Sequence, residues 1–202
     1  MASIEFVTVE VPDTEAAERF YTAAVGLGTQ VRLRASEAPT TGFRGFTLSL
    51  VVSQPATVDG LISAAVDAGA TPLKPAAKSL WGYGGVVQAP DGTIVTVASS
   101  SKKDTGPATG QIDAIVLQLG VVDVAASKRF YVDRSLTVAK SYGRRYVEFD
   151  TGPVKLTLYK RRALAKVAGV SPDGTGSHRL VIGSDAGPFT DPDGFVWEAA
   201  SL

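Results

Sequence analysis

Cysteine is absent from the 202 residues, so disulfide bonds, thiolate nucleophiles and cysteine-ligated zinc sites are excluded. Histidine occurs once, at position 178. Neither sign of charge is in excess, because Lys and Arg together number 20 and Asp and Glu together number 20. Without a surplus of basic residues, neither nucleic acid nor an anionic membrane is expected as the main partner.

Long apolar runs are also absent. No stretch approaches the roughly 20 apolar residues that a membrane-spanning helix needs. The first residues, "MASIEFVTVEV", alternate polar and apolar side chains and lack the basic and apolar regions of a signal peptide. We therefore expect a soluble, cytoplasmic protein with no membrane partner. The apolar content of 45% is sufficient for a packed core.

An internal repeat organises the chain. The segment "VPDTEAAERFY" at residues 11–21 resembles "VVDVAASKRFY" at residues 121–131, a separation of 110 residues. The triplet Pro-Asp-Gly occurs at residues 90–92 and again at 192–194, a separation of 102 residues. The two separations are similar but unequal, which indicates two related halves of which the second is shorter between its markers.

The repeat also suggests where the halves begin and end. We predict a first half at residues 1–98 and a second half at residues 111–202. Between them, residues 99–110 read "SSSKKDTGPATG", and this polar stretch with Gly and Pro is typical of a linker.

Each half is predicted to open with a strand and a helix. In "IEFVTVEV", residues 4–11, the alternation places Phe6 on one face and the valines on the other. Asp13 or Thr14 is the expected N-cap of the first helix, and Asp123 that of its counterpart.

The order of strand, helix and three strands, doubled in each half, resembles the vicinal oxygen chelate superfamily. This group includes glyoxalase I, extradiol dioxygenases and the bleomycin- and fosfomycin-resistance proteins. The resemblance rests on the two segments that end in "RFY", on the endings "APDGTIVTV" and "DPDGFVWEA", and on "WGYGGVVQAPDG" at residues 81–92. These short markers recur in the same order over nearly the whole chain.

The resemblance implies an α+β fold. Paired βαβββ modules would form curled mixed or antiparallel sheets around a cavity, with helices packed outside. This chain would hold four modules in two related halves. The first module is shortened, since it lacks its last two strands, and the last module lacks its helix.

The resemblance also implies where the ligands of a divalent ion would lie, namely in the first and last strands of each module. In a common motif a histidine stands seven residues before the capping aspartate, but Phe6 and Val116 occupy these positions here. Thr96 stands where the terminal carboxylate is expected. In the fourth module the corresponding residues are His178 and Glu198, which could bind metal.

We therefore expect a protein that binds a small organic molecule in a sheet-lined cavity, with no tightly bound metal and no other cofactor. Phe6 would stack on a flat ligand, while Trp81 and Tyr83 would wall the mouth of the pocket among the glycines of "SLWGYGG". The candidate ligand-binding residues are Phe6, Trp81, Tyr83, His178 and Glu198.

Two alternatives remain open. One is a metal-dependent lyase, isomerase or dioxygenase in which His178 and Glu198 bind one divalent ion, with Glu148 as a candidate third ligand. The other is a degenerate, non-catalytic interaction or dimerisation protein, because incomplete modules leave sheet edges that a second copy could cover in a homodimer. Under the simplest structural interpretation, His178 lies in a turn, Glu198 is solvated and Trp81 caps the core.

Overall fold

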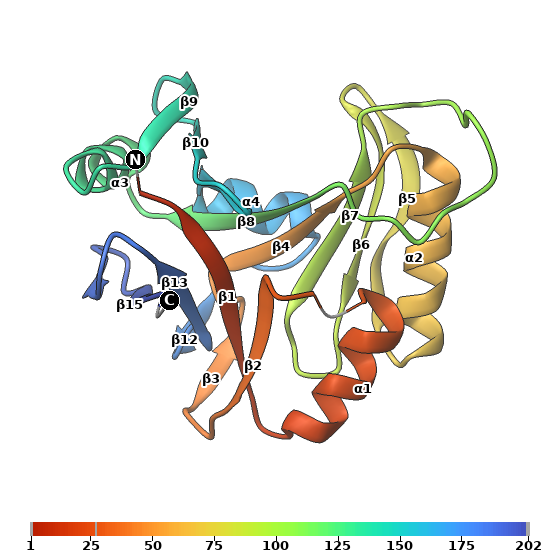
Figure 1. Cartoon of the computed structure of the whole chain (residues 1–202), viewed down its shortest axis with the longest axis horizontal. Helices are drawn as coiled ribbons and strands as arrows, with labels where there is room; N and C mark the ends of the chain where they lie inside the picture. Colours follow the sequence, from red (N-terminus) through yellow and green to blue (C-terminus); the bar gives the residue numbers. More distant parts are fainter. Residues whose placement is uncertain (1, 27, 201–202) are drawn as a thin grey trace.

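Two sheets contain nearly all the strands of this computed structural model, which describes residues 2–26 and 28–200 (Figure 1). The larger sheet has eight strands in the order β5-β6-β7-β4-β8-β11-β10-β9. These strands are β4 (Phe46–Val51), β5 (Thr71–Ser79), β6 (Gly82–Gln88), β7 (Ile94–Ser99), β8 (Ala114–Val121), β9 (Thr137–Tyr142), β10 (Tyr146–Asp150) and β11 (Val154–Lys160).

The smaller sheet has five strands in the order β14-β15-β13-β1-β2. They are β1 (Ile4–Val11), β2 (Val31–Ala35), β13 (Leu180–Ser184), β14 (Phe189–Thr190) and β15 (Val196–Ala199). Two short strands, β3 (Thr40–Gly42) and β12 (Gly174–Gly176), pair only with each other. The mixed sheets and the four helices of the described residues confirm the predicted α+β class.

Each sheet takes one module from each half of the sequence. Antiparallel pairing of β4 with β8 joins the second module to the third, and antiparallel pairing of β1 with β13 joins the first to the fourth. The first module contributes only β1 and β2 to its sheet, and the fourth contributes strands without a helix. The sequence halves are therefore interleaved in space.

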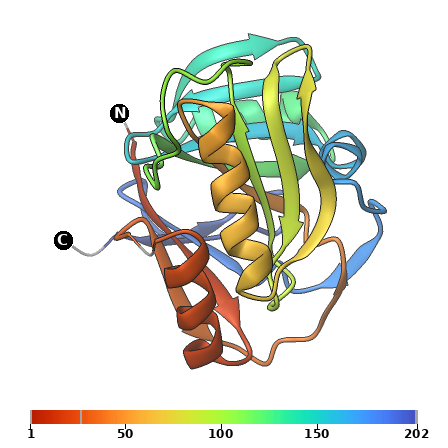
Figure 2. The same ribbon diagram turned by 90° about the vertical axis from the view of Figure 1, so that its right-hand side faces the viewer.

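Three of the helices are α1 (Thr14–Ala24), α2 (Pro55–Asp67) and α3 (Val124–Val132). The carboxylate of Asp13 accepts a hydrogen bond from the backbone N–H of Ala16, and Asp123 caps α3 in the same way, so both repeats start their helix as the sequence predicts. Figure 2 shows α2 lying along β5, β6 and β7, with α1 beside it. None of the described helices is long and apolar enough to cross a bilayer.

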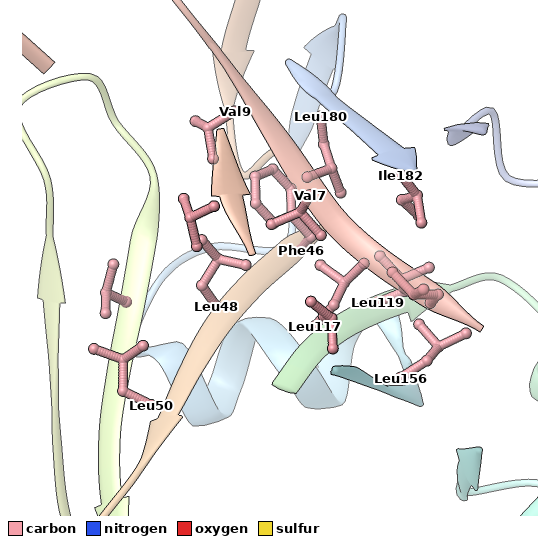
Figure 3. Packing of buried hydrophobic residues seen from close by; sticks show 14 of the residues in the cluster. Val7, Val9, Phe46, Leu48, Leu50, Leu117, Leu119, Leu156, Leu180 and Ile182 are labelled. Carbon is pink, nitrogen blue, oxygen red and sulfur yellow. The ribbon is translucent and has the colours of Figure 1, made fainter. Parts of the chain in front are cut away.

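The main core lies between the two sheets (Figure 3). Val7 and Val9 of β1 lie close to Phe46 and Leu48 of β4, and all four side chains are buried. This confirms that the valines of the first strand occupy its core face. Trp197 on β15 is also buried, with 1% of its surface exposed. Removing so much apolar surface from water is the main stabilising contribution to the fold.

The fourth helix, α4 (Arg161–Ala168), lies on the other face of the eight-stranded sheet. The eight-stranded sheet packs on the five-stranded sheet with one face and contacts α4 with the opposite face. We call the face that contacts α4 the inner face. Gly120 of β8 permits the approach, since a Cβ there would lie 3.0 Å from the Cα of Arg161. Leu164 then packs over the sheet in a second apolar cluster with Phe43, Val86 and Ile94.

The predicted linker has no helix or strand after Ser99, but it is docked on the protein. The side chain of Gln54 donates to the carbonyl of Pro107 at 2.7 Å and accepts from the backbone N–H of Thr105 at 2.8 Å and of Gly106 at 3.1 Å. This side chain fixes the segment that connects the halves.

Candidate ligand-binding clefts

A cleft of about 560 Å³ opens on the inner face of the eight-stranded sheet, and we call it the eight-strand cleft. Small residues form one row across three strands, because Ala77 pairs with Gly84 and Gly84 pairs with Ala98. A row without large side chains leaves a flat surface on the sheet. Val167 of α4 borders the cleft from the helix side.

The next row across the sheet is polar. Ser49 of β4 is the partner of Thr96 on β7, and both line the cleft. Among the described residues, neither hydroxyl takes part in a hydrogen bond, so both can bind a ligand. Neighbouring strands are about 4.8 Å apart, which sets the approximate spacing of the two hydroxyl groups.

A chain of hydrogen bonds continues across β4, β8 and β11. The hydroxyl of Thr47 donates to Oε1 of Gln118 at 2.8 Å, and Nε2 of Gln118 donates to the hydroxyl of Tyr159 at 3.5 Å. Burial, and next the negative charge of Glu148, raise the pKa of Tyr159, which therefore keeps its proton. Because Tyr159 accepts from Gln118, its O–H is available to donate to a ligand in the cleft.

Lys74 connects the edge strand β5 to α4. Its ammonium donates to the carbonyl oxygens of Lys166 at 2.6 Å and of Val167 at 2.7 Å, at the C-terminal end of the helix. A cation at this end satisfies free carbonyls and complements the helix dipole. Lys74 therefore helps to fix the helix that borders the cleft.

Trp81 and Tyr83 both border the eight-strand cleft, but in different ways. Trp81 lies in the turn between β5 and β6 with 89% of its surface exposed, so it is free to contact a ligand at the mouth. The ring of Tyr83 packs against the main core and its hydroxyl donates to Asp59 of α2 at 2.7 Å. This hydrogen bond, the largest cause, raises the pKa of Tyr83. Tyr83 thus extends towards α2 on the opposite face of the sheet.

A second cleft, of about 480 Å³, lies on the five-stranded sheet, and we call it the five-strand cleft. His178 and Glu198 both border it. One guanidinium nitrogen of Arg34 donates to the two carboxylate oxygens of Glu198 at 3.0 and 2.8 Å, and another lies 4.0 Å from Glu10. A protein cation therefore already occupies the space between these two carboxylates.

Both ring nitrogens of His178 face backbone carbonyl oxygens. Nδ1 lies 2.5 Å from the oxygen of Arg44 and Nε2 lies 3.0 Å from that of Asp193, while the ring stacks on Phe195 with centroids 4.0 Å apart. A metal ligand needs a nitrogen lone pair directed at the ion. In this arrangement His178 connects three segments of the protein, and neither nitrogen faces open space.

Phe6 lies on the same face of the five-stranded sheet as Glu198, but it is only 3% exposed. The guanidinium of Arg32 lies 3.4 Å from its ring centroid, and a Cβ at Gly183 would come within 2.4 Å of two ring carbons. The ring is covered on one side by a cation and fitted against a glycine, so a flat ligand cannot stack on it without displacing Arg32.

The five candidate residues do not share one cavity. Phe6 and Glu198 belong to the five-stranded sheet and His178 lies in the loop before β13, whereas Tyr83 belongs to the eight-stranded sheet and Trp81 lies in its β5–β6 turn. Glu148 is also on the eight-stranded sheet, where it pairs with Thr157 and lies 3.8 Å from the ammonium of Lys140. The sheet order therefore separates Glu148 from His178 and Glu198.

The residues present do not fit a divalent metal ion. On the paired modules of the eight-stranded sheet, the first and last strands present the neutral side chains of Thr47, Thr96, Gln118 and Thr157 on the inner face. Hydroxyl and amide oxygens without a carboxylate or imidazole are weak ligands. Within residues 2–26 and 28–200, no group of three or more His, Cys, Asp and Glu side chains could hold an ion.

The inner-face residues have a recognisable pattern in the sequence. "FTLSLV" and "AIVLQLGV" interrupt apolar strands with Thr47, Ser49 and Gln118 at alternating positions. A polar side chain at every second position of an otherwise buried strand indicates a polar face. Tyr159 follows Thr157 at the same two-residue spacing, one residue before the end of its strand.

Comparison with solved structures places this architecture among known folds. Glyoxalase I from Zea mays superposes with a TM-score of 0.61 at 14% identity, covering 98% of this chain and 91% of that one. A single-substitution variant of the same protein gives 0.61 at 16% identity, with the same coverage. A proposed dioxygenase from Bacillus subtilis gives 0.57 at 11% identity, covering 89% of this chain and 69% of the other. No family model and no curated protein matches the sequence.

These similarities define the class of protein as an α+β fold built of paired βαβββ modules. The chain has the fold of glyoxalase I, as its sequence markers predict, and the similarity extends over nearly its full length.

Proposed function

We propose that the protein binds a flat organic molecule in the eight-strand cleft, without a tightly held metal ion. One observation carries the proposal. The cleft combines a flat row of Ala77, Gly84 and Ala98 with hydrogen-bonding groups at one end, Ser49 and Thr96, that have no bonds within the described part of the protein. Apolar clefts with a few converging polar groups are typical of small-molecule sites.

The test is a thermal-shift screen of flat aromatic molecules, followed by calorimetric titration of those that stabilise the protein. Ala98→Leu fills the flat row from a position that already carries a Cβ and should abolish binding, while Thr96→Val keeps the shape of the side chain and removes its hydroxyl. We expect Thr96→Val to weaken binding by about 1 kcal/mol. Glu198→Gln in the five-strand cleft is the control and should bind as the parent does.

The alternative of a metal-dependent enzyme is not favoured. The carboxylate of Glu198 accepts hydrogen bonds from Arg34, and both ring nitrogens of His178 face backbone carbonyl oxygens. The alternative of an interaction protein makes a different prediction. In that case no small molecule would stabilise the parent protein, and Ala98→Leu would not change the result of the screen. Sedimentation of the chain with and without ligand measures homodimer formation independently of this question.

A further inference from the structure

We propose that the ligand of the eight-strand cleft is an organic anion, a planar ring system carrying a carboxylate. This inference rests on the proposed function and adds the chemical class of the ligand. It follows from the charges around the cleft, from the direction of the hydrogen-bond donors, and from the order of the rows on the sheet.

The charges bordering the two clefts have opposite signs. The charged side chains that line the eight-strand cleft are Lys74 and Lys78. The five-strand cleft is lined by three carboxylates and by Arg34 and His178. A cleft with charge of one sign attracts ligands of the other sign, so the eight-strand cleft favours an anion.

Two acidic groups near the eight-strand cleft already accept hydrogen bonds from other side chains of the protein. Asp59 accepts the hydrogen bond from Tyr83 on the α2 side of the sheet. Glu148 accepts from the hydroxyl of Tyr146 at 3.1 Å and lies 3.8 Å from Lys140. By contrast, Lys78 makes no ion pair within residues 2–26 and 28–200. The positive charge of Lys78 on β5 is therefore less neutralised by neighbouring groups than the negative charges of Asp59 and Glu148.

The position of Lys74 indicates where the carboxylate would bind. One row of the sheet contains, in order, Lys74, Val86, Thr96 and Ser49. The lysine side chain and the two hydroxyl groups therefore belong to the same row. An ammonium has three protons, of which Lys74 uses two on α4, and the third can be donated to a ligand. The row continues through Val116 to Lys155, and Tyr159, four residues farther along β11, borders the same cleft and adds a further donor outside the row.

The small-residue row gives the ring its place. It lies two residues along the strands from the polar row, a distance of about 6.8 Å, with Trp81 beyond it at the mouth. A carboxylate on the polar row would therefore place a fused ring over Ala77, Gly84 and Ala98, within reach of the exposed indole. The length fits a two-ring aromatic acid.

The experiment compares 2-naphthoate with 2-naphthamide, which has the same shape and no charge, by calorimetric titration of the full chain at pH 7. We expect naphthoate to bind at least tenfold more tightly. Raising the salt concentration from 50 to 500 mM should weaken naphthoate severalfold and leave naphthamide unchanged, because screening acts only on the charged probe. This comparison needs no variant and so does not depend on any substitution folding.

Three variants locate the charge. Lys78→Gln should reduce naphthoate affinity severalfold without changing naphthamide. Lys74→Gln should reduce naphthoate affinity more than naphthamide affinity, because Lys74 also holds α4. Lys103→Gln in the linker is the matched control and should have no effect. Equal binding of the two probes would overturn the carboxylate and leave the proposed function standing. Binding of neither probe would overturn both. Loss of naphthoate in Arg34→Gln, with full affinity in Lys74→Gln, would move the anion to the five-strand cleft and refute this proposal.

Discussion

The hydroxyl of Tyr21 donates a hydrogen bond to the carboxylate of Asp91 at 2.9 Å. These residues belong to the two sequence markers of the first half, "RFY" and Pro-Asp-Gly. In the second half Tyr131, the counterpart of Tyr21, donates to Asp191, which lies two residues before Asp193. Each bond joins a helix of one sheet's module to a loop of the other sheet, so the repeated markers hold the two sheets together.

Removing the hydrogen bond between Tyr131 and Asp191 should destabilise the protein. Tyr131 is fully buried and its pKa is raised strongly, first by burial and then by the charge of Asp191, so it remains a donor. We expect Tyr131→Phe to cost about 1–3 kcal/mol of unfolding free energy, because it leaves a buried carboxyl with one partner fewer. Urea denaturation measures the loss. An effect below about 0.5 kcal/mol would show that the bond contributes little.

Asp191 should make stability depend on pH. Burial, its largest cause, raises the pKa of this carboxyl above the ordinary 3.8, so the folded state holds the proton more tightly than the unfolded chain does. The contribution of the protonated carboxyl is complete below about pH 3.8 and is lost as pH rises through the folded pKa. Relative to Asp191→Asn, the parent should therefore lose unfolding free energy as the pH increases from 3 to 7.

Asp123 supplies the opposite sign as a control. Backbone N–H groups of Ala126 and then Ala125 lower the pKa of this helix cap below 3.8. Its contribution is present above that pH and is lost as pH falls through the folded value. Relative to Asp123→Asn, the parent should lose stability towards low pH. If both difference curves had the same slope, the assignment of the two carboxyls would be incorrect.

The position of α4 depends on a glycine. A Cβ at Gly120 would lie 3.0 Å from the Cα of Arg161 and 3.2 Å from the carbonyl oxygen of Gly45, and backbone cannot move aside as a flexible side chain does. We expect Gly120→Ala to destabilise the protein by about 1–3 kcal/mol and to increase hydrogen exchange in α4.

Gly60, in the exposed part of α2, has nothing within 4 Å of the corresponding position. Gly60→Ala should stabilise the protein by up to about 1 kcal/mol.

Local features of the fold could be predicted from the sequence. The caps at Asp13 and Asp123 and the core face of the first strand follow from short-range patterns, and the structure contains them. These features depend on helix and strand periodicity and on the chemistry of a single side chain, which neighbouring residues determine.

The pairing of the modules could not be predicted in this way. Whether β1 joins β13 or another strand depends on which sheet edges remain free after folding, and no short motif encodes that choice. As a result the sequence alone leaves Glu148 as a candidate third ligand beside His178 and Glu198, whereas the structure places it on the other sheet. The hydrogen bond from Arg34 to Glu198 could not be predicted from the sequence either, because the two residues are 164 positions apart.

The absence of suitable ligands predicts that the protein responds weakly to metal. His178 contacts two carbonyl oxygens and the ring of Phe195, and Glu198 forms two hydrogen bonds with Arg34. Elemental analysis after dialysis against Mn²⁺, Ni²⁺ and Zn²⁺ should find well under one equivalent of any ion.

His178→Ala should lower the unfolding free energy by about 1–3 kcal/mol, through lost contacts, without altering that metal content. Glu198→Gln should change it by less than about 1 kcal/mol, since exposed ion pairs contribute little. One equivalent of metal in the parent that disappears in both variants would make the five-strand cleft a metal site, and Arg34 would then have to leave Glu198 when the ion binds.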